Sequence, residues 1–411
     1  MKNKWRIYLK PFDSDGNYTD WVEVTDDIIL DSLGSVNSDI DNTEYDIGVN
    51  RFSNFNITFR NDSGKYSDVG EDKSIFRYKR SDSLLKITWE IENGGPYVGI
   101  ATSGSGYLSE EIEIFQGLLN DESLKMDIKK QELTFTCLGR EAIFQRTIVP
   151  FDTVDNGDLY SETLYKILNQ SAITNLLTLD DANIDCGLDQ TIDSIASLQN
   201  KTVQEGLNKL LLASNSVLYI ENGTIFISPR EPGVSVAFTF YGQGSQAGPE
   251  NIVDLKNIQG GLNKTFNFFT WKDTALVSQD PSSVSKYGAR KKEVSFEFTT
   301  DETKQQNILD SLKDEFKNPQ QEFNITTPLS YQSLAVNLLD RVAIDYPRVY
   351  VSTGKQIPIC GVAICGDPET ATLPKGLWAF TVSDDDGYKV LGKSIDMKNE
   401  NITFRVRKIE T

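Results

Sequence analysis

The stretch Phe55-Asn56-Ile57-Thr58-Phe59-Arg60 is followed directly by Asn61-Asp62-Ser63-Gly64. Its apolar side chains alternate with polar ones, which is the pattern of a β-strand that is buried on one face. The Asn/Asp/Ser/Gly run after it favours a turn. Residues 87–91 and 133–137 repeat the alternation. Short strands separated by turn signals predict a first β-barrel over residues 1–150.

The character of the sequence changes between residues 151 and 231. Thr202 and Glu205 have the spacing of a capping box, which predicts a helix that begins at this point and has an apolar stripe. Asn222-Gly223 lies between two apolar runs and supplies the positive φ angles of a type I′ hairpin turn. We therefore expect an inserted α+β module over residues 151–231.

Strand patterns return after residue 232 and continue to the end of the chain. Residues 232–366 are predicted to form a second β-barrel, interrupted by one helix that begins after Asp301 and ends at Phe316. In residues 367–411, apolar side chains alternate at Ile402, Phe404 and Val406, so this segment is expected to return as strands to a barrel. The predicted fold class is mainly β (α+β), with two β-barrel domains and the inserted module.

The composition excludes most catalytic chemistry. The chain of 411 residues contains no histidine, which removes Ser-His-Asp and Cys-His systems and HExxH zinc sites. The spacing of Cys360 and Cys365 matches neither a redox nor a zinc motif, and Cys137 and Cys186 stand alone. Carboxylate pairs, as in glycosidases, need no histidine, but proximity among 60 acidic residues cannot be read from the sequence. We predict no enzymatic activity, no catalytic residues and no cofactor.

Two acidic segments resemble calcium loops in part. Asp13, Asp15 and Asn17 occupy the first, third and fifth positions of such a loop, but Tyr18 and Val24 stand where the loop needs glycine and glutamate. Flanking strand patterns favour a hairpin turn. Asp384-Asp385-Asp386-Gly387 is interpreted in the same way, so no metal site is predicted.

The net charge of −19 comes from 41 basic and 60 acidic residues, and the acids are clustered. Residues 11–50 hold 11 acids and no Lys or Arg, and residues 151–200 hold nine acids and only Lys166 as a base. Such tracts indicate either a solvated surface or an electronegative surface shared in an oligomer. The acidity disfavours sequence-specific nucleic-acid binding. No apolar run is long enough for membrane insertion, and without a signal peptide we expect assembly in the cytoplasm.

The order of these elements resembles that of tailed-phage baseplate hub (tail hub) proteins. The first barrel of that family resembles residues 24–67, with 113–119 and 133–139 as its closing strands, and the helix at 202–213 with its hairpin resembles the inserted module. The second barrel resembles the helix at 301–316, residues 327–344 and the last strand at 401–407. Leu339 stands where the family commonly has glycine, so the turn before Asp340 is expected to differ.

The resemblance implies a structural virion protein of the tail baseplate, assembled in the host cytoplasm. It implies a homotrimer with two barrels per subunit, which forms a pseudo-sixfold ring around the DNA exit channel. Tail tube or distal-tail ring proteins would lie above it, and tip, spike or fibre proteins below. The alternatives are a distal-tail or other baseplate ring protein, or a carbohydrate-binding receptor-recognition module whose tryptophans stack on sugars.

The first acidic tract leads to a hypothesis about the channel. A negative wall would repel a departing duplex, whereas basic groups would bind its phosphates. We expect the residues that face the lumen to be among these acids of the tract: Asp26, Asp27, Asp31, Asp39, Asp41, Glu44 and Asp46.

Overall fold

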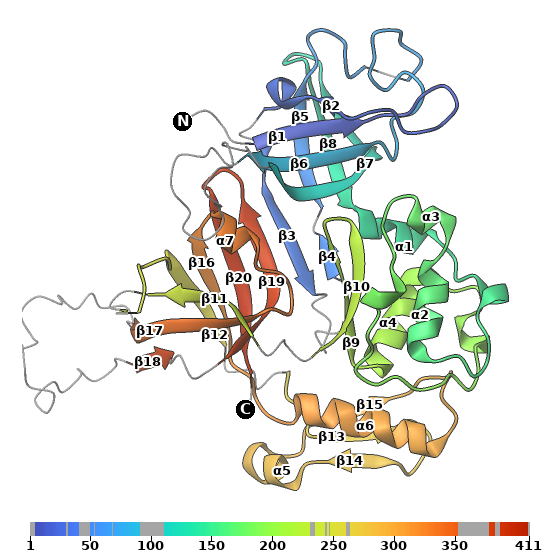
Figure 1. Ribbon diagram of the computed structural model, residues 1–411, viewed down its shortest axis with the longest axis vertical. Helices are drawn as coiled ribbons and strands as arrows, with labels where there is room; N and C mark the ends of the chain where they lie inside the picture. The colour runs from blue at the N-terminus through green and yellow to red at the C-terminus, as the bar shows by residue number, and fades with distance from the viewer. Residues whose placement is uncertain are drawn as a thin grey trace, which may run out of the picture.

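The computed structural model describes residues 5–29, 32–40, 50–52, 54–67, 69–90, 111–230, 235–242, 245, 247–259, 264–351, 378–382 and 387–409. The predicted fold class is confirmed, because the chain is mainly β and contains two curled half-barrel sheets. Helices gather beside the second sheet and below the first (Figure 1).

The first sheet contains six antiparallel strands in the order β2-β1-β6-β7-β8-β5. Their bounds are β1 (Trp5–Lys10), β2 (Val22–Glu23), β5 (Phe55–Arg60), β6 (Leu84–Glu90), β7 (Glu111–Asp127) and β8 (Glu132–Gly139). The strand predicted at 55–60 is confirmed as β5, with Phe55, Ile57 and Phe59 buried. It lies at one end of the sheet and pairs with β8.

The second sheet contains nine strands, six of them in the order β11-β17-β19-β20-β16-β12. These are β11 (Val236–Tyr241), β12 (Asp254–Gln259), β16 (Glu322–Pro328), β17 (Arg341–Val351), β19 (Tyr388–Asp396) and β20 (Asn401–Lys408). The other three are β18 (Trp378–Val382), which pairs with β17, and β3 (Ser35–Ile40) with β4 (Asn50–Phe52), which join at β19. The predicted last strand is β20, and it lies inside this sheet between β19 and β16.

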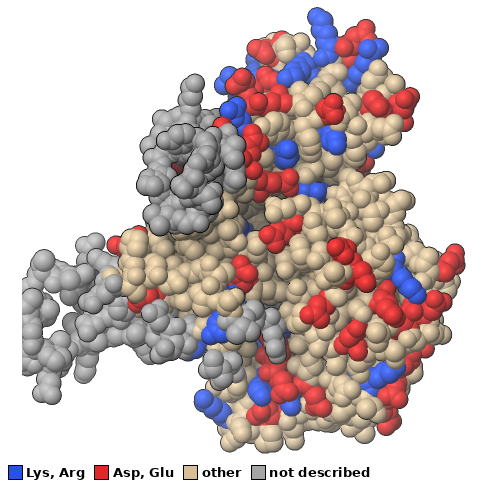
Figure 2. Space-filling view, viewed as in Figure 1, with Lys and Arg blue, Asp and Glu red and all other residues tan. Residues whose placement is uncertain are grey.

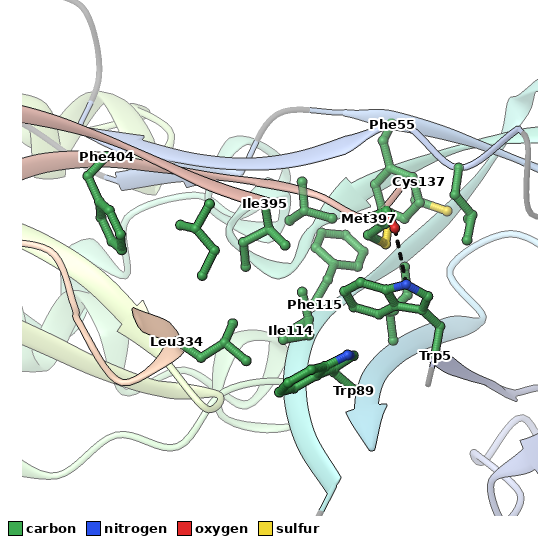
Figure 3. Close-up of a cluster of buried hydrophobic side chains, with 14 of the residues drawn as sticks. Trp5, Phe55, Trp89, Ile114, Phe115, Cys137, Leu334, Ile395, Met397 and Phe404 are labelled. Carbon is green, nitrogen blue, oxygen red and sulfur yellow. Dashed lines mark hydrogen bonds between the residues drawn. The ribbon is translucent and has the colours of Figure 1, made fainter. Parts of the chain in front are cut away.

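Strand β3 connects the two sheets. It comes from the segment predicted as the first barrel, yet it pairs antiparallel with β19 of the second sheet, with Val36 opposite Ile395. The physical reason is a shared core, because Trp5 and Phe115 of the first sheet belong to the same buried cluster as residues of the second. Figure 3 shows the labelled side chains of both sheets facing one another in this core.

The inserted module contains helices and one hairpin. Within residues 151–231 lie α2 (Tyr160–Leu168), α3 (Ser171–Thr174), α4 (Val203–Ala213), β9 (Ser216–Glu221) and β10 (Thr224–Pro229). The short helix α1 (Ile143–Arg146) precedes them, in the segment expected to belong to the first barrel. The predicted capping box is present, since the Thr202 hydroxyl accepts a hydrogen bond from the Glu205 amide and the Glu205 carboxylate accepts one from the Thr202 amide. Asn222 and Gly223 have φ of 47° and 78°, as the type I′ turn requires.

Short 3₁₀ turns lie at Thr25–Asp27, Arg140–Ala142, Phe151–Thr153, Asp181–Asn183 and Ala196–Leu198.

A third unit lies between β12 and β16. It contains β13 (Phe268–Trp271), β14 (Val277–Gln279), β15 (Lys291–Val294), α5 (Pro281–Tyr287) and α6 (Glu302–Phe316). Helix α6 begins after Asp301 as predicted, and the Asp301 side chain caps it. The sequence grouped this helix with the second barrel, but its buried stripe belongs to the core of the inserted module.

The short helix α7 (Tyr331–Leu334) precedes the turn at Leu339. Leu339 has φ of 66°, the left-handed conformation that glycine adopts at lower cost. Burial of the Leu339 side chain offsets that cost.

Candidate functional site

Three of the seven acids predicted to face a lumen lie within the described residues. Asp26 and Asp27 belong to the 3₁₀ turn after β2, and Asp39 lies on β3. Of these three, Asp26 is exposed, and Asp27 and Asp39 are half-buried. Asp31, Asp41, Glu44 and Asp46 lie outside the described residues.

Asp27 is partnered by groups far away in the sequence. Its carboxylate accepts hydrogen bonds from Lys65 Nζ at 2.7 Å and from the Tyr66 hydroxyl at 2.6 Å. Burial opposes ionisation of Asp27, but these two hydrogen bonds outweigh it and lower its pKa. Burial and the neighbouring carboxylate raise the pKa of Tyr66. Lys65, which lies outside residues 11–50, therefore neutralises the charge of Asp27.

Asp39 belongs to a chain of ion pairs on the second sheet. Arg405 Nη2 donates to Asp39 Oδ1 at 2.5 Å, and Arg405 Nη1 lies 3.7 Å from Glu322 Oε2. Glu322 also accepts a hydrogen bond from Arg407 Nε at 2.6 Å. Arg405 and Arg407 alternate with the apolar residues of β20, as residues of a polar face do, yet Arg407 is only 2% exposed and lies near Glu315 of α6.

A second buried charge cluster joins the three parts of the chain. Glu315 of α6 accepts a hydrogen bond from Lys389 of β19 at 3.1 Å and lies 3.5 Å from Arg230, which follows β10. Burial opposes ionisation of Glu315, but the positive charges of Lys389 and Arg230 outweigh it and lower its pKa to about 2. Burial lowers the pKa of Lys389 to about 8. This cluster was not predicted, because its members are far apart in the sequence.

Residues of β3 line two cavities. The first, of about 610 Å³, is lined mainly by polar side chains that include Asn37, Gln204 and Asn324. The second, of about 620 Å³, has apolar walls and acidic residues at Glu111 and Glu221. A hollow is visible between the upper and lower parts of the molecule in Figure 2.

Lys393 of β19 lines both cavities. Its ammonium donates hydrogen bonds to the backbone carbonyls of Leu334 at 2.5 Å and Val336 at 2.9 Å. Burial lowers the pKa of Lys393 to about 8. This lysine fixes α7 against β19 and so shapes the mouth of the second cavity.

The turn at Asp13 has the predicted hairpin geometry. The Asp13 carboxylate accepts hydrogen bonds from the amides of Asp15 and Asn17, and Phe12 pairs with Tyr18 across the turn. Across the described ranges, no group of three or more acidic or cysteine side chains is arranged to hold a metal ion. Cys137 is buried in β8, and burial raises its pKa, as expected for a structural thiol. Residues 384–386, Cys360 and Cys365 lie outside the described residues.

Among the helices that the structure describes, none is both long and apolar enough to span a membrane. The charged side chains gathered around β3, β19 and β20 bind one another. This arrangement is suited to holding the two sheets and the third unit in a fixed geometry, with the two cavities between them.

Solved structures share this fold along nearly the whole chain. The tail protein from Neisseria meningitidis MC58 is 10% identical, with a TM-score of 0.53, and the match covers 99% of this chain and 96% of that one. The 43 kDa tail protein of prophage MuSo2 from Shewanella oneidensis is 12% identical, with a TM-score of 0.50 and coverage of 98% and 96%. Prophage tail protein gp18 from Listeria monocytogenes EGD-e is also 12% identical, with a TM-score of 0.50 and coverage of 97% and 94%.

No protein-family model matches the sequence. No curated protein matches it either. The likeness to the three tail proteins is therefore a likeness of fold.

Proposed function

We propose that this chain is a structural protein of a phage virion, a baseplate hub ring that connects the tail tube to the distal tip. The observation that carries the proposal is the match in fold to three tail proteins, which covers at least 97% of this chain and at least 94% of each of theirs. A match over whole chains supports a shared architectural role better than one shared domain would.

The architecture is consistent with a ring. Each subunit contributes two curled sheets, so three copies would supply six similar units around one axis. The first sheet ends at β2 and β5. Ile28, Ile29 and Ser32 cover part of the β5 edge, so the β2 edge is the one that we propose a neighbouring subunit binds. We propose a homotrimer around the DNA exit channel, with tail tube or distal-tail ring proteins on one side and tip, spike or fibre proteins on the other.

The buried tryptophans disfavour the carbohydrate-binding alternative. Trp5, Trp89 and Trp271 are each at most 6% exposed, so their ring faces are unavailable to a sugar. Trp21 is partly exposed, and the ammonium groups of Lys10 and Lys86 lie over its ring. The proposed role is architectural and involves no catalysis.

Electron cryomicroscopy of virions, with this chain marked by an epitope-specific antibody fragment, tests the proposal. We expect the label at the distal end of the tail and three copies of the chain in one ring. Absence of the chain from purified virions would contradict the tail role. Six or twelve equivalent copies in a ring would contradict the trimer and favour a distal-tail or other baseplate ring protein.

A further inference from the structure

The tip of the hairpin formed by β7 and β8 is unusually apolar for an exposed turn. Residues 125–131 are all exposed, and among them Ile128 is 79% and Met126 51% exposed. The Asp127 carboxylate accepts hydrogen bonds from the amides of Lys129 and Lys130, which fixes the turn in one conformation. The tip therefore presents a preformed apolar surface.

The same tip is basic. Lys125, Lys129 and Lys130 surround the two apolar side chains, and only Asp127 opposes their charge within residues 125–131. Asp127 binds backbone amides rather than the lysine ammonium groups, and within the described part of the chain none of the three lysines forms an ion pair. In a chain of net charge −19, a cationic apolar tip is suited to an acidic apolar partner.

The second cavity has the complementary chemistry. Its walls include Ile112, Ile114, Leu334, Leu338 and Ile395, three of which are labelled in Figure 3. Its volume of about 620 Å³ is large enough for two aliphatic side chains.

Three carboxylates lie at this cavity. Glu113 is paired with Arg140 at 2.7 Å. Glu111 accepts hydrogen bonds from the hydroxyls of Tyr8 and Thr88. Glu221 accepts one from the Asn337 side-chain amide and lies near the Lys393 ammonium, which lines the same cavity. Three carboxylates against the one lysine Lys393 leave the lining of this apolar pocket with an excess of negative charge, which favours a cationic partner.

We propose that the hairpin tip of one copy of this chain docks into the second cavity of another copy, with Ile128 and Met126 in the pocket and the lysines beside Glu111 and Glu221. The inference stands apart from the proposed tail role, since it requires only two copies of the chain.

The geometry makes this contact intermolecular. Strand β7 has 17 residues, and it begins at the cavity with Glu111 and ends at the tip with Asp127. Residues 111–118 of β7 pair with β6 and residues 117–127 pair with β8, so the sheet holds the cavity and the tip at opposite ends of this strand, at most about 50 Å apart. We therefore expect the tip to reach the cavity of another copy. A contact between two different surfaces is heterologous, and repetition of such a contact closes a ring or extends a filament.

Mixed cross-linking tests the contact. Ile128→Cys and Ala335→Cys are made in separate chains, since Ala335 is small, exposed and lines the cavity. The two proteins are mixed at the highest soluble concentration and treated with a short bismaleimide. We expect a cross-linked dimer in the mixture and at most background in either protein alone, because the proposed contact does not bring two identical engineered cysteines together.

Paired substitutions test the chemistry by analytical ultracentrifugation. Self-association should weaken about tenfold or more in Ile128→Asp and in Lys129→Glu/Lys130→Glu, because each change removes one of the complementary features. Val69→Asp and Lys73→Glu/Lys272→Glu are matched controls at exposed positions outside residues 125–131 and outside the cavity lining, and they should associate like the unmodified chain. Glu111→Lys should partly restore association of the Lys129→Glu/Lys130→Glu chain.

Several results would overturn the inference: a monomer at every concentration, no mixed cross-link, or equal weakening by the controls. A single chain that carries both Ile128→Cys and Ala335→Cys provides one more test, because an intramolecular cross-link in its monomer would overturn the inference as well. These results leave the tail role unaffected, because that role is judged by the place of the chain in the virion.

Discussion

The indole Nε1 of Trp5 donates a hydrogen bond of 3.1 Å to the backbone carbonyl of Met397, which lies 392 residues later in the chain. Both residues are buried, and Figure 3 shows the bond within the core that the two sheets share. The first strand of the first sheet is thus fixed to the loop between β19 and β20 of the second. This hydrogen bond joins the two half-barrels within their shared core.

Replacement of Trp5 by Phe tests this link. Phenylalanine keeps most of the apolar surface but leaves the buried Met397 carbonyl without its donor, so we expect a loss of about 1–3 kcal/mol in the free energy of unfolding. The measurement is urea denaturation followed by circular dichroism. Trp21→Phe is the control, since the Trp21 ring is partly exposed. Equal stability of the two variants would contradict a role for the hydrogen bond.

Truncation after Asn399 tests the place of β20. The deletion removes Ile402, Phe404 and Val406, each fully buried and worth roughly 1.5–3 kcal/mol. Their sum is comparable to the net stability of a domain, so the truncated chain should aggregate or become sensitive to protease. Limited proteolysis provides the measurement, and a chain that ends at Ile409 is the control. A soluble truncated chain with an unchanged melting temperature would contradict the prediction.

Local signals in the sequence predicted local structure well. Alternation identified β5 and β20, and the capping box at Thr202 and the turn at Asn222-Gly223 were found where predicted. Each of these features is determined by residues a few positions apart, because strand period, helix capping and turn conformation are short-range effects.

The sequence patterns did not predict which distant strands and side chains pair with one another. Nothing local indicates that β3 leaves the first sheet for β19, since alternation shows which face is buried and not against which partner. Similarly, the pairing of Asp39 with Arg405 joins residues 366 positions apart. The first acidic tract contains no Lys or Arg, so its charge was unopposed in the sequence pattern. In the folded chain, Lys65 and Arg405 from other segments pair with Asp27 and Asp39.

The buried charge cluster at Glu315 predicts a specific dependence on pH. The folded state lowers the pKa of Glu315 from an ordinary 4.5 to about 2. Below pH 4.5 the unfolded chain therefore binds a proton that the folded chain does not, so stability falls as the pH falls from 4.5 towards 2. At pH values above 4.5, the lowered pKa of Glu315 contributes its full amount, about 3 kcal/mol, to the free energy of unfolding.

Glu315→Gln tests this dependence through urea denaturation at a series of pH values. At neutral pH the variant should lose about 3–5 kcal/mol, because Lys389 and Arg230 lose their buried partner. The difference from the unmodified chain should shrink between pH 4.5 and 2 as Glu315 itself becomes protonated. Glu302→Gln, at an exposed position on the same helix, is the control. A difference that stays constant with pH would rule out the assigned shift.

The last prediction concerns the proposed lumen surface. Asp26 is the best described position for the test, because Asp27 and Asp39 hold Lys65 and Arg405, and a change there would break an ion pair. If Asp26 faces the channel, Asp26→Lys places a cation in each subunit where it can bind DNA phosphates. We expect normal assembly and slower DNA ejection, most strongly at low salt, since charges are screened within about 8–10 Å at physiological salt.

Ejection is measured as the rate of dye binding to released DNA at two salt concentrations. Asp62→Lys makes the same charge change at another exposed position of the first sheet's turns and should leave the rate unaltered. If virions with Asp26→Lys eject DNA at the unmodified rate at low salt, Asp26 lies on the outer surface and serves solubility. A slowing that persists unchanged at high salt would point to a steric cause, because an electrostatic one is weakened by counterions.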